Sequence, residues 1–311
     1  MLGSDLSNSM PSESAQDRSP AGSSPPQFMV QFWGVRGSIP TPGLETARYG
    51  GNTPCVEIYV AGKRLIFDGG TGLRILGKHL RKEMPVEAHL FFTHTHWERI
   101  QGFPFFAPAF VPGNCFHIYG ATGPNGASIK QRLSDQMLRP NFPVPLQKMQ
   151  SDLKFVDITP GSIVTLDDVT VETVALNHST GALGYRITWD GHSVVYATDT
   201  ERSPDRLAQI DQSLMYLAQQ ADVLIYDAAY GEQAYLDPDA AAGQQSDAWQ
   251  LGIDVAIAAN VKTMVMFHHD PSHEDDFLDH VELEVQSQFR HAQLAREGMM
   301  IDVLKTTAVD P

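Results

Sequence analysis

A pair of histidines directly follows a hydrophobic run in the segment FFTHTHWERIQGFPFF (91–106). His94 and His96 are separated by one residue, so in an extended or turning backbone both imidazoles lie on the same side and can bind one ion. An isolated His-x-His pair is common on protein surfaces and carries little weight alone. Here a carboxylate, Glu98, follows at once. We therefore interpret the pair as metal ligands.

Further histidines and aspartates end later strand-like runs. His178 follows VTVETVALN, Asp199 ends SVVYATD, and His268 and His269 follow TMVMF. Groups at the ends of several strands converge on one rim of a sheet, where sites are commonly built. Asp68 ends RLIFD in the same way, and it either belongs to this site or caps the next helix.

Short β-rich runs separated by Gly, Pro and Asn turns predict the strands that position these residues. The expected strands are 28–33, 55–60, 64–68, 87–93, 115–119, 153–157, 163–166, 169–177, 184–189, 193–198, 223–227, 263–268 and 299–304. The expected helices are 71–82, 128–138, 204–219, 247–260 and 273–295, the last capped by Ser272 and Asp275. Two similar halves of this kind predict an α/β fold of four layers, αββα.

The composition excludes several classes of protein. The chain has 311 residues, 37 acidic against 22 basic side chains, and a formal net charge of −15. This charge argues against a DNA-binding protein, whose affinity comes largely from Lys and Arg. No uninterrupted apolar run reaches the roughly 18 residues that span a bilayer, so we expect no membrane partner.

The first 27 residues are rich in Ser and Pro and hold almost no large apolar side chains. Such a segment cannot bury enough surface to offset its ordering entropy, so 1–27 is predicted to be a disordered tail and 28–311 a single domain. The tail lacks the features of a signal peptide, which predicts a cytoplasmic protein. Cys55 and Cys115 are interpreted as two buried thiols in a reducing compartment.

Eight short motifs resemble those of the metallo-β-lactamase superfamily and occur in the same order as in that family. The resemblance is specifically to its phosphodiesterase-like branch near tRNA 3′-processing endonucleases and cyclic phosphodiesterases. The motifs are GVRGSIPTPG (34–43), GGNTPC (50–55), IFDGGTGLR (66–74), THTHWERIQGFPFF (93–106), LNHSTGALGYRI (176–187), YATDTE (196–201), LIYDAAY (224–230) and MFHHDP (266–271). The resemblance implies a metallo-β-lactamase-like αββα sandwich over nearly everything after residue 28.

The resemblance also implies a set of metal ligands. The first metal site would use His94, His96 and His178, Asp199 would bridge two metals, and His268, or failing it His269, would complete the second site. Asp68 would be an outer carboxylate that orients a ligand imidazole, and Asp227 another supporting group. The expected ion is zinc or manganese.

Three departures from the family pattern concern the catalytic machinery. The family's second-site Asp is Glu98, and the following His is Arg99, which cannot deprotonate to act as an ordinary ligand. Neither cysteine lies in a segment that could replace it. At 243–250 the stretch GQQSDAWQ lacks the histidine that in many relatives assists proton transfer to the leaving group. These changes favour one bound ion over two.

Arg99 has two alternative roles: its charge either stands where the second ion would lie and holds a phosphate oxygen, or it pairs with Glu98 and Asp199 and closes an empty site. Arg36 and Asn52 are expected near the rim, where they either contact substrate or support tight turns.

The leading hypothesis is a metal-dependent hydrolase of a phosphodiester or similar ester, with Asp199, Glu98 and Arg99 in catalytic roles. A small phosphorylated or ester ligand, such as a cyclic nucleotide, is favoured over tRNA because the chain has no basic surplus. The alternative is an inactive pseudoenzyme that binds a ligand or a protein partner as a regulator. The resemblance further implies a homodimer.

Overall fold

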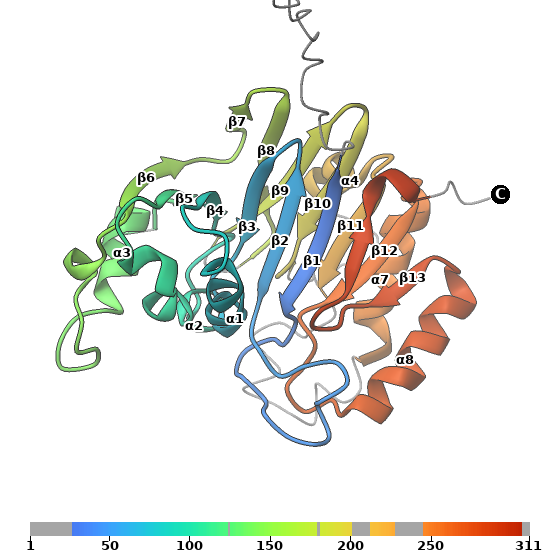
Figure 1. Cartoon of the computed structure of the whole chain (residues 1–311). Coiled ribbons are helices and arrows are strands. Elements are labelled where there is room, and N and C mark those ends of the chain that lie inside the picture. The colour runs from blue at the N-terminus through green and yellow to red at the C-terminus, as the bar shows by residue number, and fades with distance from the viewer. Residues whose placement is uncertain (1–26, 124, 179–180, 201–211, 228–244, 307–311) are drawn as a thin grey trace, which may run out of the picture.

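The computed structural model describes residues 27–123, 125–178, 181–200, 212–227 and 245–306. The predicted tail, apart from Gln27, lies outside these residues. Two seven-stranded sheets stack face to face, with helices on both outer faces, as Figure 1 shows. The four-layer αββα architecture expected from the sequence is confirmed.

The first sheet combines antiparallel and parallel strands. Its order is β14 (Met300–Asp302), β1 (Phe28–Gly34), β2 (Cys55–Val60), β3 (Lys63–Phe67), β4 (Glu87–Phe91), β5 (Cys115–Ala121) and β6 (Asp152–Ile158). The strands from β3 to β6 run parallel. Their carboxyl ends therefore meet at one edge, and the histidine segment follows β4 at that edge.

The second sheet repeats this arrangement with a different connection order. Its order is β13 (Ala292–Leu294), β12 (Thr263–Phe267), β11 (Val223–Asp227), β10 (His192–Ala197), β9 (Ala182–Trp189), β8 (Val169–Leu176) and β7 (Ile163–Leu166). The strands from β10 to β13 are parallel, and β11 and β12 are buried along their whole length. Continuous apolar runs suit such strands because both of their faces are covered.

The core between the sheets is rich in aromatic rings. Phe67 and Phe91 stack with their centroids 5.3 Å apart, and Tyr185 meets both rings edge-on. All three rings are fully buried, and burying one such side chain contributes about 1.5–3 kcal/mol. This packing fixes the relative position of the strand ends that carry the site.

Helices cover the outer face of each sheet. The outer helices of the first sheet are α1 (Thr71–Leu80), α2 (Trp97–Ile100) and α3 (Ile129–Asp135). Those of the second are α4 (Gln212–Ala218), α7 (Gln245–Ala258) and α8 (Asp275–Gln288). The stretch between α2 and β5 contains two short 3-10 helices, Phe103–Phe105 and Ala107–Phe110. No helix in the described part of the chain is long and apolar enough to cross a membrane.

The structure corrects the predicted last helix. α8 ends at Gln288, and 292–294 pair with β12 as strand β13 instead of continuing the helix. The expected caps are also wrong, because Glu274 is the N-cap and no side chain caps the helix. The Asp275 carboxylate instead accepts hydrogen bonds from the backbone amides of Arg48 and Tyr49. Tertiary pairing thus overrides the local helical pattern.

The two cysteines lie in different environments. Cys55 in β2 is fully buried, as expected. Cys115 in β5 is only half-buried, so the expectation of a second buried thiol is wrong. The cause is that β5 and β6 lie toward the edge of their sheet.

Candidate metal centre

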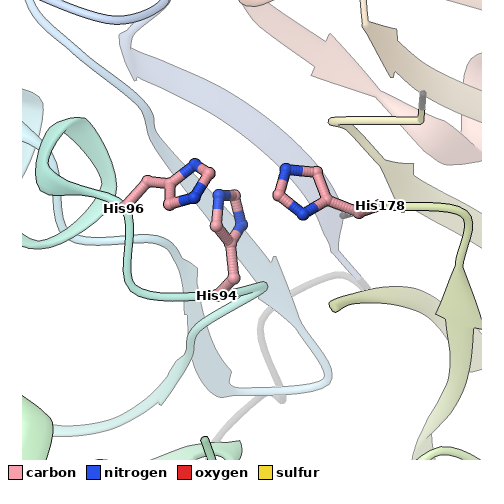
Figure 2. Close-up of side chains that lie close together, drawn as sticks. All are labelled: His94, His96 and His178. Atoms are coloured by element: carbon pink, nitrogen blue, oxygen red, sulfur yellow. The ribbon is translucent and has the colours of Figure 1, made fainter. Parts of the chain in front are cut away.

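Three imidazoles converge where the two sheets meet (Figure 2). His94 and His96 come from the loop after β4 in the first sheet, and His178 follows β8 in the second. The ring centroids lie 4.3 Å apart for His94–His96, 4.8 Å for His94–His178 and 5.0 Å for His96–His178. One nitrogen of each ring lies within 4.8 Å of the other two. Three imidazole nitrogens in this arrangement can bind one tetrahedral zinc ion.

The environment of His94 fits a metal ligand. The ring is buried, and Nδ1 lies 3.0 Å from the hydroxyl of Thr93, whereas the buried Nε2 has no hydrogen-bond partner among the described residues. Leaving a buried polar atom unpaired costs about 1–3 kcal/mol, which an ion at Nε2 would offset. Burial holds the pKa of His94 well below its usual range, so the ring is neutral, as a ligand must be.

Asp199 stands beside this cluster. One of its oxygens, the ligand nitrogen of His94 and one oxygen of Glu98 lie within 4.8 Å of one another. The backbone amide of Asp199 donates a hydrogen bond of 2.8 Å to the Asp227 carboxylate. A carboxylate held in this way can serve as the fourth ligand of an ion on the histidines, or can orient a water molecule next to it.

Three side chains at this edge sit on left-handed backbone. Asp68, Asp199 and His268 have φ values of 61°, 62° and 62°, directly or shortly after β3, β10 and β12. This conformation costs an L-residue about 1–2 kcal/mol and is seldom adopted outside functional sites and turns. The repeated strain at three strand ends turns these side chains into the space between the sheets.

The guanidinium of Arg99 lies within this group and is fully buried. Its Nη1 donates to Asp68 Oδ2 at 2.7 Å and to the Tyr196 hydroxyl at 2.9 Å, and its Nη2 contacts Asp199 Oδ2. The two carboxylates keep the pKa of Arg99 well above its usual value, although burial opposes this. The expected partner Asp199 is present, but the second carboxylate is Asp68 and not Glu98.

Asp68 serves the site indirectly. Its Oδ1 accepts from the Thr93 amide at 2.9 Å and from the Thr93 hydroxyl at 3.0 Å, and that hydroxyl in turn lies next to the ring of His94. Asp68 therefore reaches the imidazole of His94 through Thr93. It does not cap α1, whose N-cap is Gly70 and which has no side-chain cap.

Of the two candidate histidines after β12, His268 faces the site. Its Nδ1 lies 3.3 Å from Asp227 Oδ1 and 3.8 Å from Asp199 Oδ1. His269 points the other way, with Nε2 2.8 Å from the carbonyl oxygen of Ala295. Asp199, Asp227 and His268 form a further set with metal-ligand spacing. Because Asp199 Oδ2 is already engaged by Arg99, this second set is only partly available to an ion.

The contacts of Arg36 and Asn52 fit the alternative in which these residues support the turns of the chain. Arg36 is fully buried and donates to the backbone carbonyl oxygens of Gly50 and His273 at 2.8 and 2.6 Å. Asn52 donates to Glu297 through its amide nitrogen Nδ2 at 2.9 Å and through its backbone N–H. Both residues hold together loops that are distant in sequence.

The sequence pattern does not identify three other residues of the site. Thr93 and Tyr196 connect the buried charges, and Trp97 is 60% exposed immediately after the ligand His96. Nothing in the spacing of Tyr196 distinguishes it from a core residue of β10. The side chain of residue 246, where the family histidine is missing, lies outside the described residues.

The chain is similar to several known proteins. Residues 63–271 match the family model described as the beta-lactamase superfamily domain. Ribonuclease Z of Synechocystis sp. is 30% identical over 124 residues, an alignment that covers 39% of this chain and 34% of that enzyme. Ribonuclease Z of Picrophilus torridus is 24% identical over 324 residues, covering 90% of this chain and 97% of that enzyme.

A likeness in structure is also evident. The crystal structure of a diphosphatase from the PhnP family superposes with a TM-score of 0.61 at 16% sequence identity, covering 89% of this chain and 98% of the other. Likeness at this level of identity concerns the fold.

Proposed function

Because the chain belongs to the beta-lactamase superfamily, we propose that it is a metal-dependent hydrolase of phosphodiesters that works on a small substrate with one zinc ion. The observation that carries this proposal is the convergence of His94, His96 and His178, with a buried Nε2 of His94 that lacks any other partner. Relatives named as ribonuclease Z and as a diphosphatase support a phosphate ester as the substrate.

The residues around the histidines have separate roles in the proposed hydrolysis. A bound zinc ion supplies a Lewis acid for a phosphoryl oxygen and lowers the pKa of a coordinated water to about 7. Asp199 lies where its carboxylate can orient the attacking water. Asp227 fixes both the Asp199 amide and the His268 ring, so these two groups keep their orientation without substrate.

Arg99 supports a one-ion centre. Its guanidinium carries a permanent positive charge and neutralises Asp68 and Asp199, a task for which a second cation would otherwise serve. Since the group is fully buried, it acts through Asp199 and is not placed to touch a phosphate oxygen. We therefore assign Arg99 as a positioning residue.

Trp97 and the net charge together favour a small substrate with a flat ring. Trp97 directly follows His96 in the sequence, its indole is 60% exposed, and an exposed aromatic ring can stack on a nucleobase. The formal net charge of −15 opposes a long polyanion such as tRNA. A cyclic nucleotide or a short nucleotide diester fits both features.

The same ion pair that supports one ion also favours a second candidate function, a non-catalytic binding protein. If Asp199 stays paired with Arg99 throughout, its carboxylate is not available to the attacking water. In that case the centre would bind a phosphorylated ligand without hydrolysing it.

Hydrolysis of bis(p-nitrophenyl) phosphate and of 2′,3′-cyclic nucleotides by the zinc-loaded protein decides between these functions. We expect turnover that falls at least 100-fold in His94→Ala and in His178→Ala and is unchanged in His280→Ala, which removes an exposed histidine of α8. No turnover above that of the two site variants, with the same ligands still bound, would establish the binding role.

A further inference from the structure

We propose that the chain carries a second, separate zinc site, built by Glu87, Cys115 and His117 on the first sheet, with Asp152 next to it. These residues belong to β4, β5 and β6 and take no part in the histidine centre. One ligand atom each of Glu87, Cys115 and His117 lies within 4.8 Å of the other two. The inference does not depend on the proposed hydrolase function.

Strand register brings the four side chains together. Glu87 pairs with Cys115 across β4 and β5, and Cys115 pairs with Asp152 across β5 and β6. His117 lies two residues after Cys115, so both side chains project from the same face of the sheet. The grouping follows from regular β-structure and needs no unusual backbone.

Two of the three distances within the set of Glu87, Cys115 and His117 match the edges of a tetrahedron around zinc, and Asp152 lies beside the sulfur. Cys115 Sγ lies 3.6 Å from His117 Nε2 and 3.7 Å from Asp152 Oδ2, and His117 Nε2 lies 3.4 Å from Glu87 Oε1. Zinc bond lengths of about 2.3 Å to sulfur and 2.0–2.1 Å to nitrogen and oxygen give tetrahedral edges of about 3.6 Å for S–N and S–O and about 3.4 Å for N–O.

The geometry differs from that of a nucleophilic Cys–His–carboxylate triad. In a triad the carboxylate binds the ring nitrogen opposite to the one that faces the sulfur. Here the sulfur and the Glu87 carboxylate both lie next to Nε2 of His117, so the donor atoms surround one point in space. Thiolate, imidazole and carboxylate around one point are the donor set that zinc prefers.

Neighbouring side chains both support and oppose this site. The ring of His117 stacks on the buried His89 with centroids 4.7 Å apart, which holds Nε2 toward the cluster. Lys154 Nζ lies 3.4 Å from Asp152 Oδ2 and competes for that oxygen. Lys154 is half-exposed and pairs with Asp152, so the protein ligands of the site are Glu87, Cys115 and His117, and the fourth position of the ion is open to water.

The second site has a direct consequence for counting metal ions. The set of Glu87, Cys115 and His117 shares no residue with the histidine centre, so each site would add its own ion. A content of two zinc ions per chain would therefore not by itself indicate a dinuclear histidine centre.

Cobalt(II) titration of the metal-free full chain distinguishes the two sites. Only a cobalt–thiolate bond gives a strong charge-transfer band in the near ultraviolet, and the histidine centre contains no sulfur. We expect this band at micromolar free cobalt both in the unchanged protein and in His94→Ala/His178→Ala. In the double variant one equivalent of cobalt should bind. Cys55→Ala is the matched control, because the Cys55 thiol is enclosed in the core and its loss should leave the band intact.

The variants Cys115→Ser and His117→Gln test the ligands. We expect Cys115→Ser to abolish the band and His117→Gln to weaken cobalt binding at this site at least 10-fold, with unchanged circular dichroism. Zinc should also slow alkylation of Cys115 by iodoacetamide at least 10-fold. A titration without a thiolate band, a band that survives Cys115→Ser, or alkylation that is indifferent to zinc would each overturn the proposal.

Discussion

The guanidinium of Arg99 and the carboxylate of Asp199 form an ion pair that joins the two sheets, with side chains 0% and 10% exposed. Arg99 belongs to the first sheet through α2, and Asp199 follows β10 of the second. Burial would raise the pKa of Asp199, but Arg99 and the nearby histidines lower it below its usual range. The carboxylate therefore stays ionised in a space with almost no solvent.

Removal of the Arg99 charge should destabilise the protein strongly. Arg99→Met leaves Asp68 and Asp199 buried without a counter-charge, and breaking a buried pair in this way costs about 3–5 kcal/mol. Urea unfolding of the metal-free protein measures the change. The matched control is Arg290→Met, an exposed arginine, with a change below about 0.5 kcal/mol.

The double variant Asp68→Asn/Arg99→Met extends this prediction. Removing one of the two orphaned charges should recover part of the lost free energy of unfolding. Equal stability of Arg99→Met and the unchanged protein at neutral pH would show that the ion pair contributes nothing to holding the sheets together.

Restoring the family pattern at two positions should create a second metal site. In Glu98→Asp/Arg99→His the guanidinium is replaced by a potential ligand, and Asp199 Oδ2 becomes available to an ion. We expect one additional zinc ion per chain, measured by elemental analysis in a Cys115→Ser background so that the sheet site does not contribute. Diester hydrolysis should rise at least 10-fold.

Two other results of that experiment would be informative. An extra ion without faster hydrolysis would point to the missing histidine at position 246 as the limiting factor. No extra ion would contradict the view that Arg99 occupies the position of the second cation.

The sequence predicts the convergence of the three histidines better than their surroundings, for a physical reason. The i, i+2 spacing of His94 and His96 and the strand-end position of His178 are local features, and parallel strands bring their carboxyl ends to one edge. The sequence predicts Arg36 and Asn52 near the rim. Their hydrogen-bond partners are backbone or side-chain groups more than ten residues away in the sequence. Such long-range partners leave no trace in local spacing.

The last helix shows the same limit for the fold. The apolar spacing of 273–295 is typical of one long helix, but Ala292 pairs with Met264 in the edge strand β13. Propensity favours the helix only weakly, and the hydrogen bonds of the sheet edge outweigh it. Strands of continuous apolar residues, such as β11 (Val223–Asp227), were predicted with their observed bounds because burial on both faces demands that composition.

Loss of the indole of Trp97 should weaken substrate binding more than catalysis. Stacking of a nucleobase on an aromatic side chain contributes about 1–3 kcal/mol, so Trp97→Ala should raise KM for a cyclic nucleotide about 5- to 150-fold with little change in kcat. Steady-state kinetics with bis(p-nitrophenyl) phosphate, cyclic nucleotides and a small dialkyl phosphate measure the effect.

The two controls for this prediction separate stacking from packing. Trp97→Phe keeps a flat ring and should retain most of the affinity, and the dialkyl phosphate, which has no ring, should show no change in KM. An equal rise in KM for every substrate would instead indicate that Trp97 positions the adjacent ligand His96.

Stability at acid pH should depend on Asp222. This residue lies at the end of the second sheet remote from the centre of His94, His96 and His178. This carboxylate is 2% exposed and accepts hydrogen bonds from Lys262 Nζ at 2.6 Å and from the Ser193 amide at 2.7 Å. Burial would raise the pKa of Asp222, but these hydrogen bonds and that of His192 lower it below its usual value. The folded state therefore holds this proton less tightly than the unfolded state.

The sign of the pH effect follows from that difference. A carboxyl whose pKa is lowered on folding contributes stability above its unfolded pKa of about 4, and this contribution is lost as the pH falls through the folded pKa. Asp222→Asn should lower the free energy of unfolding by about 1–3 kcal/mol at pH 7, the range for hydrogen bonds to charged groups, and by less below pH 4. Asp254→Asn, at an exposed position of α7, serves as the control. Urea titrations from pH 7 to pH 3.5 test this, and a gap between Asp222→Asn and the unchanged protein that stays constant over this range would refute the assigned pKa shift.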